Sequence, residues 1–452
     1  MRFPLALTAR IAAYIIGKKF RGIEKFATVL QLEPLHTCNL TCTGCGRIRE
    51  YSQSLKEVLS LEDCLGAARE CGAPMVSICG GEPLIYPHIE DLVAGLLAQK
   101  RIVYICTNGV FMRKKLRDHL AAEFAANPAR TARKIEVLVS EELLTPEQAA
   151  EIREGKSETG AERSETDCRR QLEGRVFESN RKAESRRAIA PSRWMYWNVH
   201  LDSTERTHDL IVEREGVFKE CIAAIRMAKI LGYQVATNTT VYRETDMREV
   251  GQMLDYLSWL GVDGHTISPG YDYDAAKEDM RKRLGLEPEN FFLTREMTKE
   301  KFKNIRAWGE KYNLFGTPIY LDFLAGRRDL TCSAWAIPTR NVGGWKGPCY
   351  LMTDAHHASY RDLLDKTPWE NYGVADGEAR DPRCENCMVH CGYEPSATLG
   401  RDAKPGDTWA NIAFNFGKKP APRIEGASVD PFNGVSAGNG HKTGRPDKLP
   451  IS

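Results

Sequence analysis

Short apolar segments alternate with longer amphipathic ones along most of this chain. Six short segments are rich in β-branched and aromatic residues and have the length of strands. Most are separated by stretches with apolar residues at helical spacing, such as Val217–Leu231 and Met247–Leu260. This alternation predicts an α/β fold with a parallel sheet, and six units suggest a partial (β/α)6 barrel. The predicted strands are Thr28–Leu35, Met75–Cys79, Ile102–Thr107, Tyr196–Leu201, Gln234–Tyr242 and Gly264–Ser268.

An insertion, residues 125–192, separates the third and fourth predicted strands and is far longer than a usual loop. Within it, Lys134–Ser140 could form a strand, and Pro146 could take the first position of a helix. Arg153–Arg187 is charge-rich with almost no aromatic residues, so we expect disorder there and no function for Cys168.

The segments that follow the sixth predicted strand have a different composition. Residues 271–400 carry aromatic-rich segments and five cysteines, which suggests a smaller second domain after a core at residues 28–270. From residue 401 onward the chain is rich in Gly, Pro, Lys and Asn, which predicts a disordered tail.

Residues 1–27 are predicted to contain an amphipathic helix. Its apolar residues form one stripe at helical spacing, and its basic residues fall on the opposite side. This pattern is typical of a helix that lies on a membrane surface, and it also fits a helix that packs on the protein's own core. The stripe consists of Leu5, Ala9, Ala12, Ile16 and Phe20, and the basic residues are Arg10, Lys18 and Arg21.

Composition excludes some classes of protein and partner. The formal net charge of +2 gives no argument for nucleic acid binding, so we expect no nucleic acid partner. Fourteen cysteines in a chain that opens without a signal-peptide cleavage pattern indicate a reducing, cytoplasmic location rather than a disulfide framework. No apolar run reaches the roughly 20 residues that span a bilayer.

Three cysteines directly follow the first predicted strand. Cys38, Cys42 and Cys45 have the spacing C-x₃-C-x₂-C, which can wrap three thiolates around one soft metal centre. A cubane iron–sulfur cluster held by three cysteines keeps one iron open for a substrate. A structural zinc site is the alternative, but it needs four ligands, and a histidine such as His36 before a metal loop more often serves packing.

The second predicted strand ends in Cys79-Gly80-Gly81-Glu82-Pro83. Paired glycines allow close backbone approach, and Glu82 could accept a hydrogen bond from an ammonium group. Together with the cysteine loop, this segment resembles the radical S-adenosylmethionine (SAM) superfamily. The resemblance implies that Cys38, Cys42 and Cys45 hold a [4Fe–4S] cluster, that its open iron binds SAM, and that Gly80, Gly81, Glu82 and Pro83 bind the methionine part of SAM.

Polar residues also lie at the carboxyl ends of the later predicted strands, where barrel enzymes build their active sites. For each residue alone, a role in a turn or cap is equally plausible. By the resemblance, SAM would contact Asn108, and its ribose would contact His200, Asp202 and Asn238.

A second cysteine group lies near the end of the chain. Cys384, Cys387 and Cys391 are close enough in sequence to bind a metal, and Cys349 is the best fourth ligand. Either an auxiliary iron–sulfur cluster or a structural zinc ion would suit these thiolates.

Several longer segments resemble the adenosylhopane synthase (adenosyl-hopene transferase) family of hopanoid biosynthesis. They are LEPLHTCNLTCTGCG, CGAPMVSICGGEPL, YICTNG, VHLD, SPGYDY, LDFLAG, PTRNVGGWKGPCYLM and CENCMVHCGYE, which together run from Leu32 to Glu394. The insertion and the tail depart from the family pattern.

That resemblance implies a transferase that adds the 5′-deoxyadenosyl radical to the alkene of the triterpene diploptene. It also implies a flavodoxin- or ferredoxin-type electron donor and favours a peripheral position at the inner membrane face, where the alkene resides. Cys106, at the end of the third predicted strand, could donate the hydrogen atom that quenches the product radical, with Cys79 as the rival donor. A peptide-modifying radical SAM maturase and a non-catalytic iron–sulfur electron-transfer protein are the alternative functions.

Overall fold

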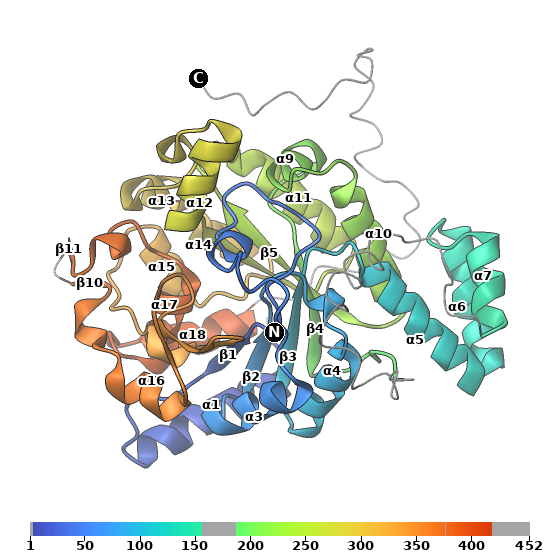
Figure 1. Ribbon diagram of the computed structural model, residues 1–452, viewed down its shortest axis with the longest axis horizontal. Coiled ribbons are helices and arrows are strands. Elements are labelled where there is room, and N and C mark those ends of the chain that lie inside the picture. The colour runs from blue at the N-terminus through green and yellow to red at the C-terminus, as the bar shows by residue number, and fades with distance from the viewer. Residues whose placement is uncertain (1–2, 156–186, 376, 418–452) are drawn as a thin grey trace.

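A single mixed sheet of nine strands organises the molecule (Figure 1). The structure, a computed structural model, describes residues 3–155, 187–375 and 377–417. Cys168 and the interior of the predicted disordered insertion lie outside these described residues. The strand order is β6-β5-β4-β3-β2-β1-β7-β8-β9, and neighbouring strands from β6 to β1 are all parallel. The predicted α/β fold with a partial parallel barrel is therefore confirmed.

All six predicted strands exist, and each boundary is close to the predicted one. The strands pair in parallel and in sequence order because each helical crossover returns the chain to the end of the sheet at which the previous strand began. The observed strands are β1 (Val29–Leu32), β2 (Met75–Ile78), β3 (Ile102–Thr107), β4 (Met195–His200), β5 (Gln234–Val241) and β6 (Gly264–Pro269).

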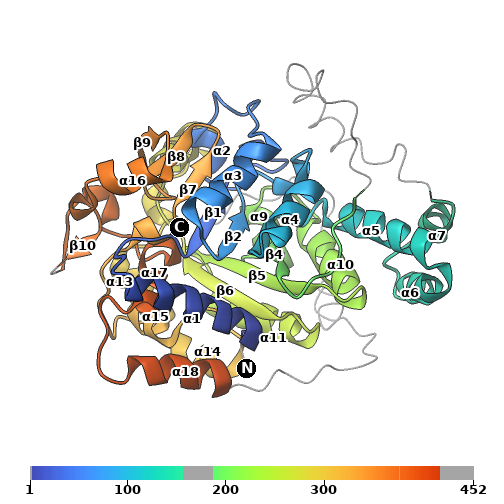
Figure 2. The same cartoon turned by 90° about the horizontal axis from the view of Figure 1, so that it is seen from below.

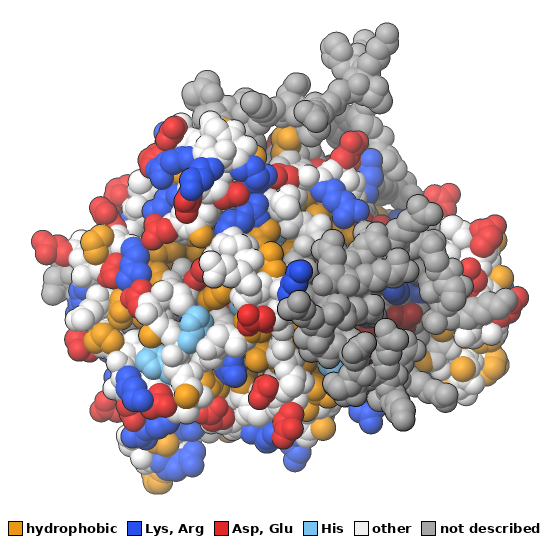
Figure 3. Space-filling model, viewed as in Figure 1, with side chains coloured by type: hydrophobic (Ala, Val, Ile, Leu, Met, Phe, Trp, Pro, Cys, Tyr) orange, Lys and Arg blue, Asp and Glu red, His pale blue; other side chains and the backbone are white. Residues whose placement is uncertain are grey.

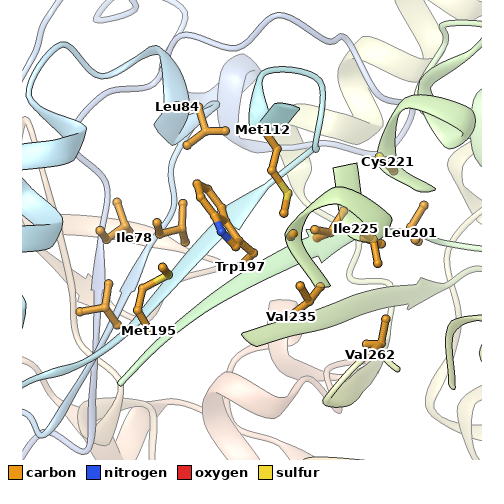
Figure 4. Close-up of a cluster of buried hydrophobic side chains, with 14 of the residues drawn as sticks. Ile78, Leu84, Met112, Met195, Trp197, Leu201, Cys221, Ile225, Val235 and Val262 are labelled. Carbon is orange, nitrogen blue, oxygen red and sulfur yellow. The ribbon is translucent and has the colours of Figure 1, made fainter. Parts of the chain in front are cut away.

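Helices pack on the outer face of this sheet. Figure 4 shows Trp197 of β4 among apolar side chains from neighbouring strands and helices, including Ile78, Met112 and Ile225, and Trp197 is completely buried. The crossover helices are α3 (Leu61–Cys71), α4 (Ile89–Ala98), α5 (Met112–Ala126), α9 (Glu205–Ile211), α10 (Val217–Ile230) and α11 (Met247–Trp259).

The insertion begins with two further helices, α6 (Pro128–Ser140) and α7 (Pro146–Arg153). The predicted strand at Lys134–Ser140 is wrong. Asn127 caps α6 by accepting a hydrogen bond from the Arg130 backbone N–H, and the buried residues of α6 recur at helical rather than alternating spacing. The predicted start of α7 is confirmed, because Thr145 and Gln148 form a reciprocal capping box.

The C-terminal segment extends the same sheet. β7 (Thr339–Asn341) pairs in parallel with β1, and β8 (Gly344–Pro348) and β9 (Thr353–His357) continue antiparallel. The boundary at residue 270 therefore does not separate two sheets. The remaining elements are α2 (Arg47–Glu50), α12 (Asp274–Asp279), α13 (Arg295–Phe302), α14 (Ile305–Lys311), α15 (Pro318–Leu324), α16 (Tyr360–Lys366), β10 (Val374–Ala375), β11 (Glu378–Ala379) and α17 (His390–Leu399).

The predicted N-terminal helix is α1 (Leu5–Phe20). Leu7 and Ile15 on its inner side are buried, and Leu7 packs with Tyr104 and Tyr196 on the inner face of the sheet. Arg10 and Lys18 also lie on this inner side, above the rings of Trp194 and Tyr14. The predicted apolar stripe is exposed: Leu5, Ala9, Ala12, Ile16 and Phe20 all face solvent.

The prediction of a disordered tail from residue 401 onward is wrong for part of that segment. Residues Asp407–Gly417 form a helix, α18, which packs beside α15 and α1 (Figure 2). An ion pair between Asp407 and Arg328 holds its first turn, and Phe414 packs against Arg306. The tail beyond residue 417 lies outside the described residues.

The surface mixes apolar, basic and acidic side chains (Figure 3). Among the described helices, none is both long and apolar enough to cross a bilayer.

Candidate active site

The cysteine loop lies at the carboxyl end of β1 and is anchored on the neighbouring β4–β5 crossover. The Thr43 backbone N–H donates to the Ile211 carbonyl over 2.8 Å, and the Thr43 hydroxyl donates to Glu213 over 2.9 Å. Because the loop is fixed between β1 and α9, its thiols occupy the mouth of the partial barrel, as the sequence predicted for an active site.

The three thiols are close enough to influence one another. Burial, with the neighbouring Glu82 carboxylate, raises the pKa of Cys38 to about 12. Burial, followed by Cys45 and Cys38, raises the pKa of Cys42 well above its usual value. Free thiols packed this way resist ionisation, whereas a bound cationic centre would stabilise the thiolates.

Two observations test whether the loop suits a [4Fe–4S] cluster. Among the described residues, no three His, Cys, Asp or Glu side chains converge tightly enough to hold a single ion. A cubane is wider than a single ion, and each thiolate binds a different iron, so its ligands need not converge on one point. The Asn39 Nδ2 beside Cys38 is buried without a hydrogen-bond partner in the described chain, which leaves a donor for a bound group. The loop fits a cluster.

The two glycines after β2 bring one loop onto the other. Gly80 has a φ of +110°, and a Cβ there would lie 2.3 Å from the Leu35 carbonyl oxygen. A Cβ on Gly81 would lie 1.9 Å from the Thr37 carbonyl oxygen. The backbone of Gly80 and Gly81 therefore packs closely against the start of the cysteine loop. This packing positions Glu82 and Pro83, which follow the glycines.

Glu82 links the carboxyl ends of β2 and β3. Its carboxylate accepts hydrogen bonds from the backbone N–H groups of Leu84 (3.0 Å) and Asn108 (2.9 Å) and from the Thr107 hydroxyl (2.8 Å). Burial raises the pKa of Glu82 to about 7. An ionised carboxylate offers about four acceptor sites. Three are filled by the protein, so about one remains for a ligand such as an ammonium group.

Asn108 connects β3 to the cysteine loop. Its Nδ2 donates to the Asn39 Oδ1 over 2.8 Å, and its backbone carbonyl accepts from the Cys221 thiol over 3.1 Å. Gly109 follows with a φ of +82°, where a Cβ would lie 2.7 Å from the Cys221 sulfur. The predicted site residue is thus held directly beside Cys38.

A histidine–aspartate pair ends β4. The His200 Nε2 and the Asp202 Oδ2 are 2.9 Å apart, and the Thr240 backbone N–H donates to the other Asp202 oxygen. Burial opposes ionisation of both side chains, but their mutual attraction outweighs it, so the pKa of His200 is raised and the pKa of Asp202 is lowered. The Asp202 charge also raises the pKa of Cys42, which places this pair beside the cysteine loop. Asn238 lies opposite His200 in the register of β5.

Cys106 lies on the inner face of β3. It packs with Tyr104 and Tyr196, whereas Ile105 belongs to the core on the other face. The Asn198 Nδ2 donates to the Cys106 sulfur over 3.4 Å, and the Ser77 Oγ lies 3.1 Å from it. Burial raises the pKa of Cys106, so its sulfur carries a proton at neutral pH. Tyr104 and Cys106 therefore share the inner face of β3.

The C-terminal cysteines share one cavity of about 260 Å³. All four predicted ligands line it, and so does a fifth cysteine, Cys332, for which no sequence pattern indicated a metal ligand. A Cβ on Gly392 would lie 2.6 Å from the Cys332 sulfur, so this glycine is what admits the fifth thiol. The predicted ligands are Cys349, Cys384, Cys387 and Cys391.

A buried charged network links the two cysteine groups. Arg47, two residues after Cys45, donates to Glu33 over 2.8 Å and to the Tyr350 carbonyl over 2.8 Å, directly after Cys349. Buried Lys346 donates to the same carbonyl over 2.8 Å. Sequence reasoning missed this network because its members are far apart along the chain.

Two aromatic residues also lie between the groups. The rings of Tyr271 and Tyr273 are 5.4 Å apart. Tyr271 lines the C-terminal cavity, and a Cβ on Gly46 in the cysteine loop would lie 2.2 Å from the Tyr273 ring. The SPGYDY segment therefore joins the barrel mouth to the second cysteine group. In the sequence, this junction was indicated only by the polar residues at the carboxyl end of β6 and in the loop that follows it.

Comparison with protein families gives two matches. Residues 32–157 match the Radical SAM superfamily, and residues 265–411 match a domain of unknown function, DUF3463. The first match contains the cysteine loop, the Gly80–Pro83 segment and β3. The second contains all five cysteines of the C-terminal cavity.

Three solved structures match parts of the chain at low sequence identity. Streptococcus suis SuiB bound to S-adenosylmethionine is 13% identical, with a TM-score of 0.43, over 73% of this chain and 61% of that chain. Native anSMEcpe with bound AdoMet and Cp18Cys peptide is 14% identical, with a TM-score of 0.46, over 86% and 99%. Methylornithine synthase (PylB) is 10% identical, with a TM-score of 0.37, over 80% and 86%. Likenesses this distant say nothing about the substrate.

The cysteine loop, the glycine-rich segment packed on it and the family match cover the same part of the barrel. Their chemistry indicates a [4Fe–4S] cluster and SAM as cofactors. On these grounds residues 32–157 form a radical SAM domain, which indicates a radical SAM enzyme.

Proposed function

We propose that this enzyme adds the 5′-deoxyadenosyl radical to the alkene of diploptene, giving adenosylhopane. The observation that carries the proposal is the position of Cys106. A protonated thiol stands on the inner barrel wall beside Tyr104 and Tyr196, whose rings stack 5.0 Å apart. An addition to an alkene needs a hydrogen atom donor and an apolar wall, and this site offers both. The segments that resemble adenosylhopane synthases supply the choice of alkene.

The residues at the barrel mouth divide the binding of the cofactors. Cys38, Cys42 and Cys45 would hold the cluster and leave one iron for SAM, which supplies the 5′-deoxyadenosyl radical when it is reductively cleaved. Glu82 would use its remaining acceptor site for the SAM ammonium group. Asn108, His200, Asp202 and Asn238 would face the adenosine part. A flavodoxin- or ferredoxin-type protein would supply the electron.

Cys106 would complete the reaction. Bond formation at the alkene leaves a carbon-centred radical on the product, and the Cys106 S–H bond is weaker than the C–H bond that would form. Transfer of the hydrogen atom would quench the product and leave a thiyl radical. One electron from the donor protein and one proton from solvent would then restore the thiol, so that each turnover consumes two electrons in total.

The C-terminal cavity is proposed to hold a second metal centre. Cys349, Cys384, Cys387 and Cys391 would bind an auxiliary iron–sulfur cluster, with Cys332 as an additional or alternative ligand. Burial raises the pKa values of Cys332, Cys384, Cys387 and Cys391, and nearby Cys349 raises them further, so the five thiols lie close together. A structural zinc ion is the alternative, but the described thiols do not converge tightly enough to hold a single ion. We also propose that the enzyme associates peripherally with the membrane that holds its substrate.

Incubation with SAM, reductant and diploptene tests the function. The expected product has the mass of diploptene plus one 5′-deoxyadenosyl group plus one hydrogen atom. Formation of 5′-deoxyadenosine alone, with diploptene recovered unchanged, would contradict the proposed substrate while leaving the SAM chemistry in place.

A further inference from the structure

An apolar face at the two ends of the described chain is left uncovered. Seven large hydrophobic side chains are exposed in the described residues, and six of them belong to α1 and α18. Phe20 and Trp409 have 92% and 74% of their surface exposed. Singly exposed apolar residues are ordinary, but six on two helices indicate a binding surface. We call these six residues the terminal face: Leu5, Ile16, Phe20, Trp409, Ile412 and Phe416.

The two helices lie side by side. The Phe3 backbone N–H donates to the Asn415 Oδ1 over 3.0 Å, and the Asn415 Nδ2 donates to the Thr8 hydroxyl over 3.3 Å. Figure 2 shows α1 and α18 next to each other along one side of the molecule. On the inner sides of the helices, Leu7 of α1 is buried and Phe414 of α18 is partly buried against the core. Their exposed outer sides therefore lie on two neighbouring helices, whose segments contact each other at Phe3, Thr8 and Asn415.

Helical spacing sets the apolar residues of α18 on one side. Trp409, Ile412 and Phe416 follow at intervals of three and four residues, which is one stripe of a helix. The stripe on α1 was visible in the sequence as an isolated feature. The structure adds a second apolar stripe on α18, a helix in the segment that was predicted to be a disordered tail.

Basic side chains border the terminal face. α1 contains no acidic residue, and Lys19, Arg21 and Lys25 are exposed at its C-terminal end. Lys19 donates to the Leu399 carbonyl, so this end lies beside the segment that leads into α18. That segment adds exposed Arg401 and Lys404.

Four acidic residues lie near these cations. Two of them are engaged by the protein, because Asp402 accepts from Thr331 and Asp407 pairs with Arg328. Glu24 and Glu370 are exposed, and Glu370 lines one cavity with Lys25 and Arg401. The border of the terminal face is therefore predominantly cationic.

We infer that the terminal face binds an anionic bilayer, with α1 and α18 lying in the plane of the interface. Apolar and aromatic side chains above a cationic border are the features by which interfacial helices bind lipid. A second copy of the chain is the weaker occupant, because a two-fold contact through this face would set one cationic border near another. The inference extends the peripheral association proposed above. Its test measures binding alone, so its failure would leave the proposed reaction standing.

Point substitutions are the suitable probes, because removing α1 would also remove buried Leu7 and Ile15. The experiment uses the full reconstituted chain and sedimentation with vesicles of phosphatidylcholine, with and without phosphatidylglycerol. One variant carries Ile16→Ser and Phe20→Ser, and another carries Trp409→Ser, Ile412→Ser and Phe416→Ser. The matched control is Val137→Ser on α6, the seventh exposed hydrophobic residue, which lies outside this face. Unchanged thermal unfolding would confirm that the variants fold.

The wild-type chain and the control should bind vesicles that contain phosphatidylglycerol, and added salt should weaken binding. Each set of substitutions should lower the partition coefficient about tenfold or more, as expected for the loss of two or three inserted apolar side chains. Full binding by the α18 variant, or no binding by the wild type, would overturn the inference. A wild-type dimer that the α18 variant dissociates would also overturn it, in favour of a second copy.

Discussion

The two cysteine groups of this enzyme differ in how their thiols are brought together. Cys38, Cys42 and Cys45 come from one loop at the carboxyl end of β1, beside polar residues from the neighbouring strands. The five C-terminal cysteines come from segments spread over residues 332–391 and line a cavity of about 260 Å³. Three thiolates leave a cubane with an open iron, whereas four or more can close it. Under the proposed function, the first group would therefore hold a reactive centre and the second group a closed one.

The largest expected effect is on SAM cleavage. Replacing Cys38, Cys42 or Cys45 by Ala should abolish 5′-deoxyadenosine formation, because the described structure brings no other thiol into this loop. Cys64→Ala in the helical core is the control, since Cys64 is buried in α3 away from the loop. Full turnover by any of the three loop variants would break the distinction between the groups.

A second prediction concerns the metal content of the closed group. Anaerobic reconstitution of the wild type should give about eight irons per chain, the content of two cubanes. The double variant Cys384→Ala, Cys387→Ala should retain about four irons and still cleave SAM. A wild type with about four irons and one zinc ion would instead assign the cavity to structural zinc.

A third prediction concerns the network that joins the groups. Arg47→Met should lower the free energy of unfolding by about 3–5 kcal/mol, because it leaves the Glu33 carboxylate buried without its cation. The control is Arg281→Met, whose ion pairs with Glu287 and Glu289 are exposed, and it should cost less than about 1 kcal/mol. Urea unfolding of the metal-free chain measures both. Equal losses of unfolding free energy in the two variants would mean that the buried network stabilises the fold no more than an exposed ion pair does.

Two carboxylates, buried Glu33 and half-buried Glu394, extend the same contrast to pH. Burial opposes ionisation of Glu33, but the neighbouring Arg47 outweighs burial and lowers the pKa of Glu33. Burial raises the pKa of Glu394 to about 7. The folded chain therefore binds a proton at Glu394 more tightly than the unfolded chain does. The stability that Glu394 contributes is present below its unfolded pKa and is lost as the pH rises through about 7.

Glu394→Gln should remove that pH-dependent loss. Between pH 5 and pH 8, the variant should gain about 1–3 kcal/mol relative to the wild type. Urea unfolding at the two pH values measures the gain. A constant difference between variant and wild type over this range would show that Glu394 does not titrate in the folded chain.

Sequence reasoning found the barrel because its signals are local. The parallel strands are short apolar runs, and the cysteine loop directly follows one of them. The C-terminal strands escaped it, because β7 contains only Thr339, Arg340 and Asn341 and becomes a strand by pairing with β1. Cys332 gave no signal for the same reason, since only tertiary packing sets it against Gly392. α18 was hidden by the composition of the tail around it.

The most direct test of the account is the origin of the hydrogen atom that ends the reaction. The Cys106 thiol exchanges its hydrogen with solvent, so the wild type in D₂O should give an adduct with one deuterium at the new C–H centre. Cys106→Ala should still cleave SAM and add the adenosyl group, but with less product, mixed stereochemistry at that centre, or both. Wild-type yield and stereochemistry from Cys106→Ala would contradict the account and would leave Cys106 with only a packing role in the barrel wall.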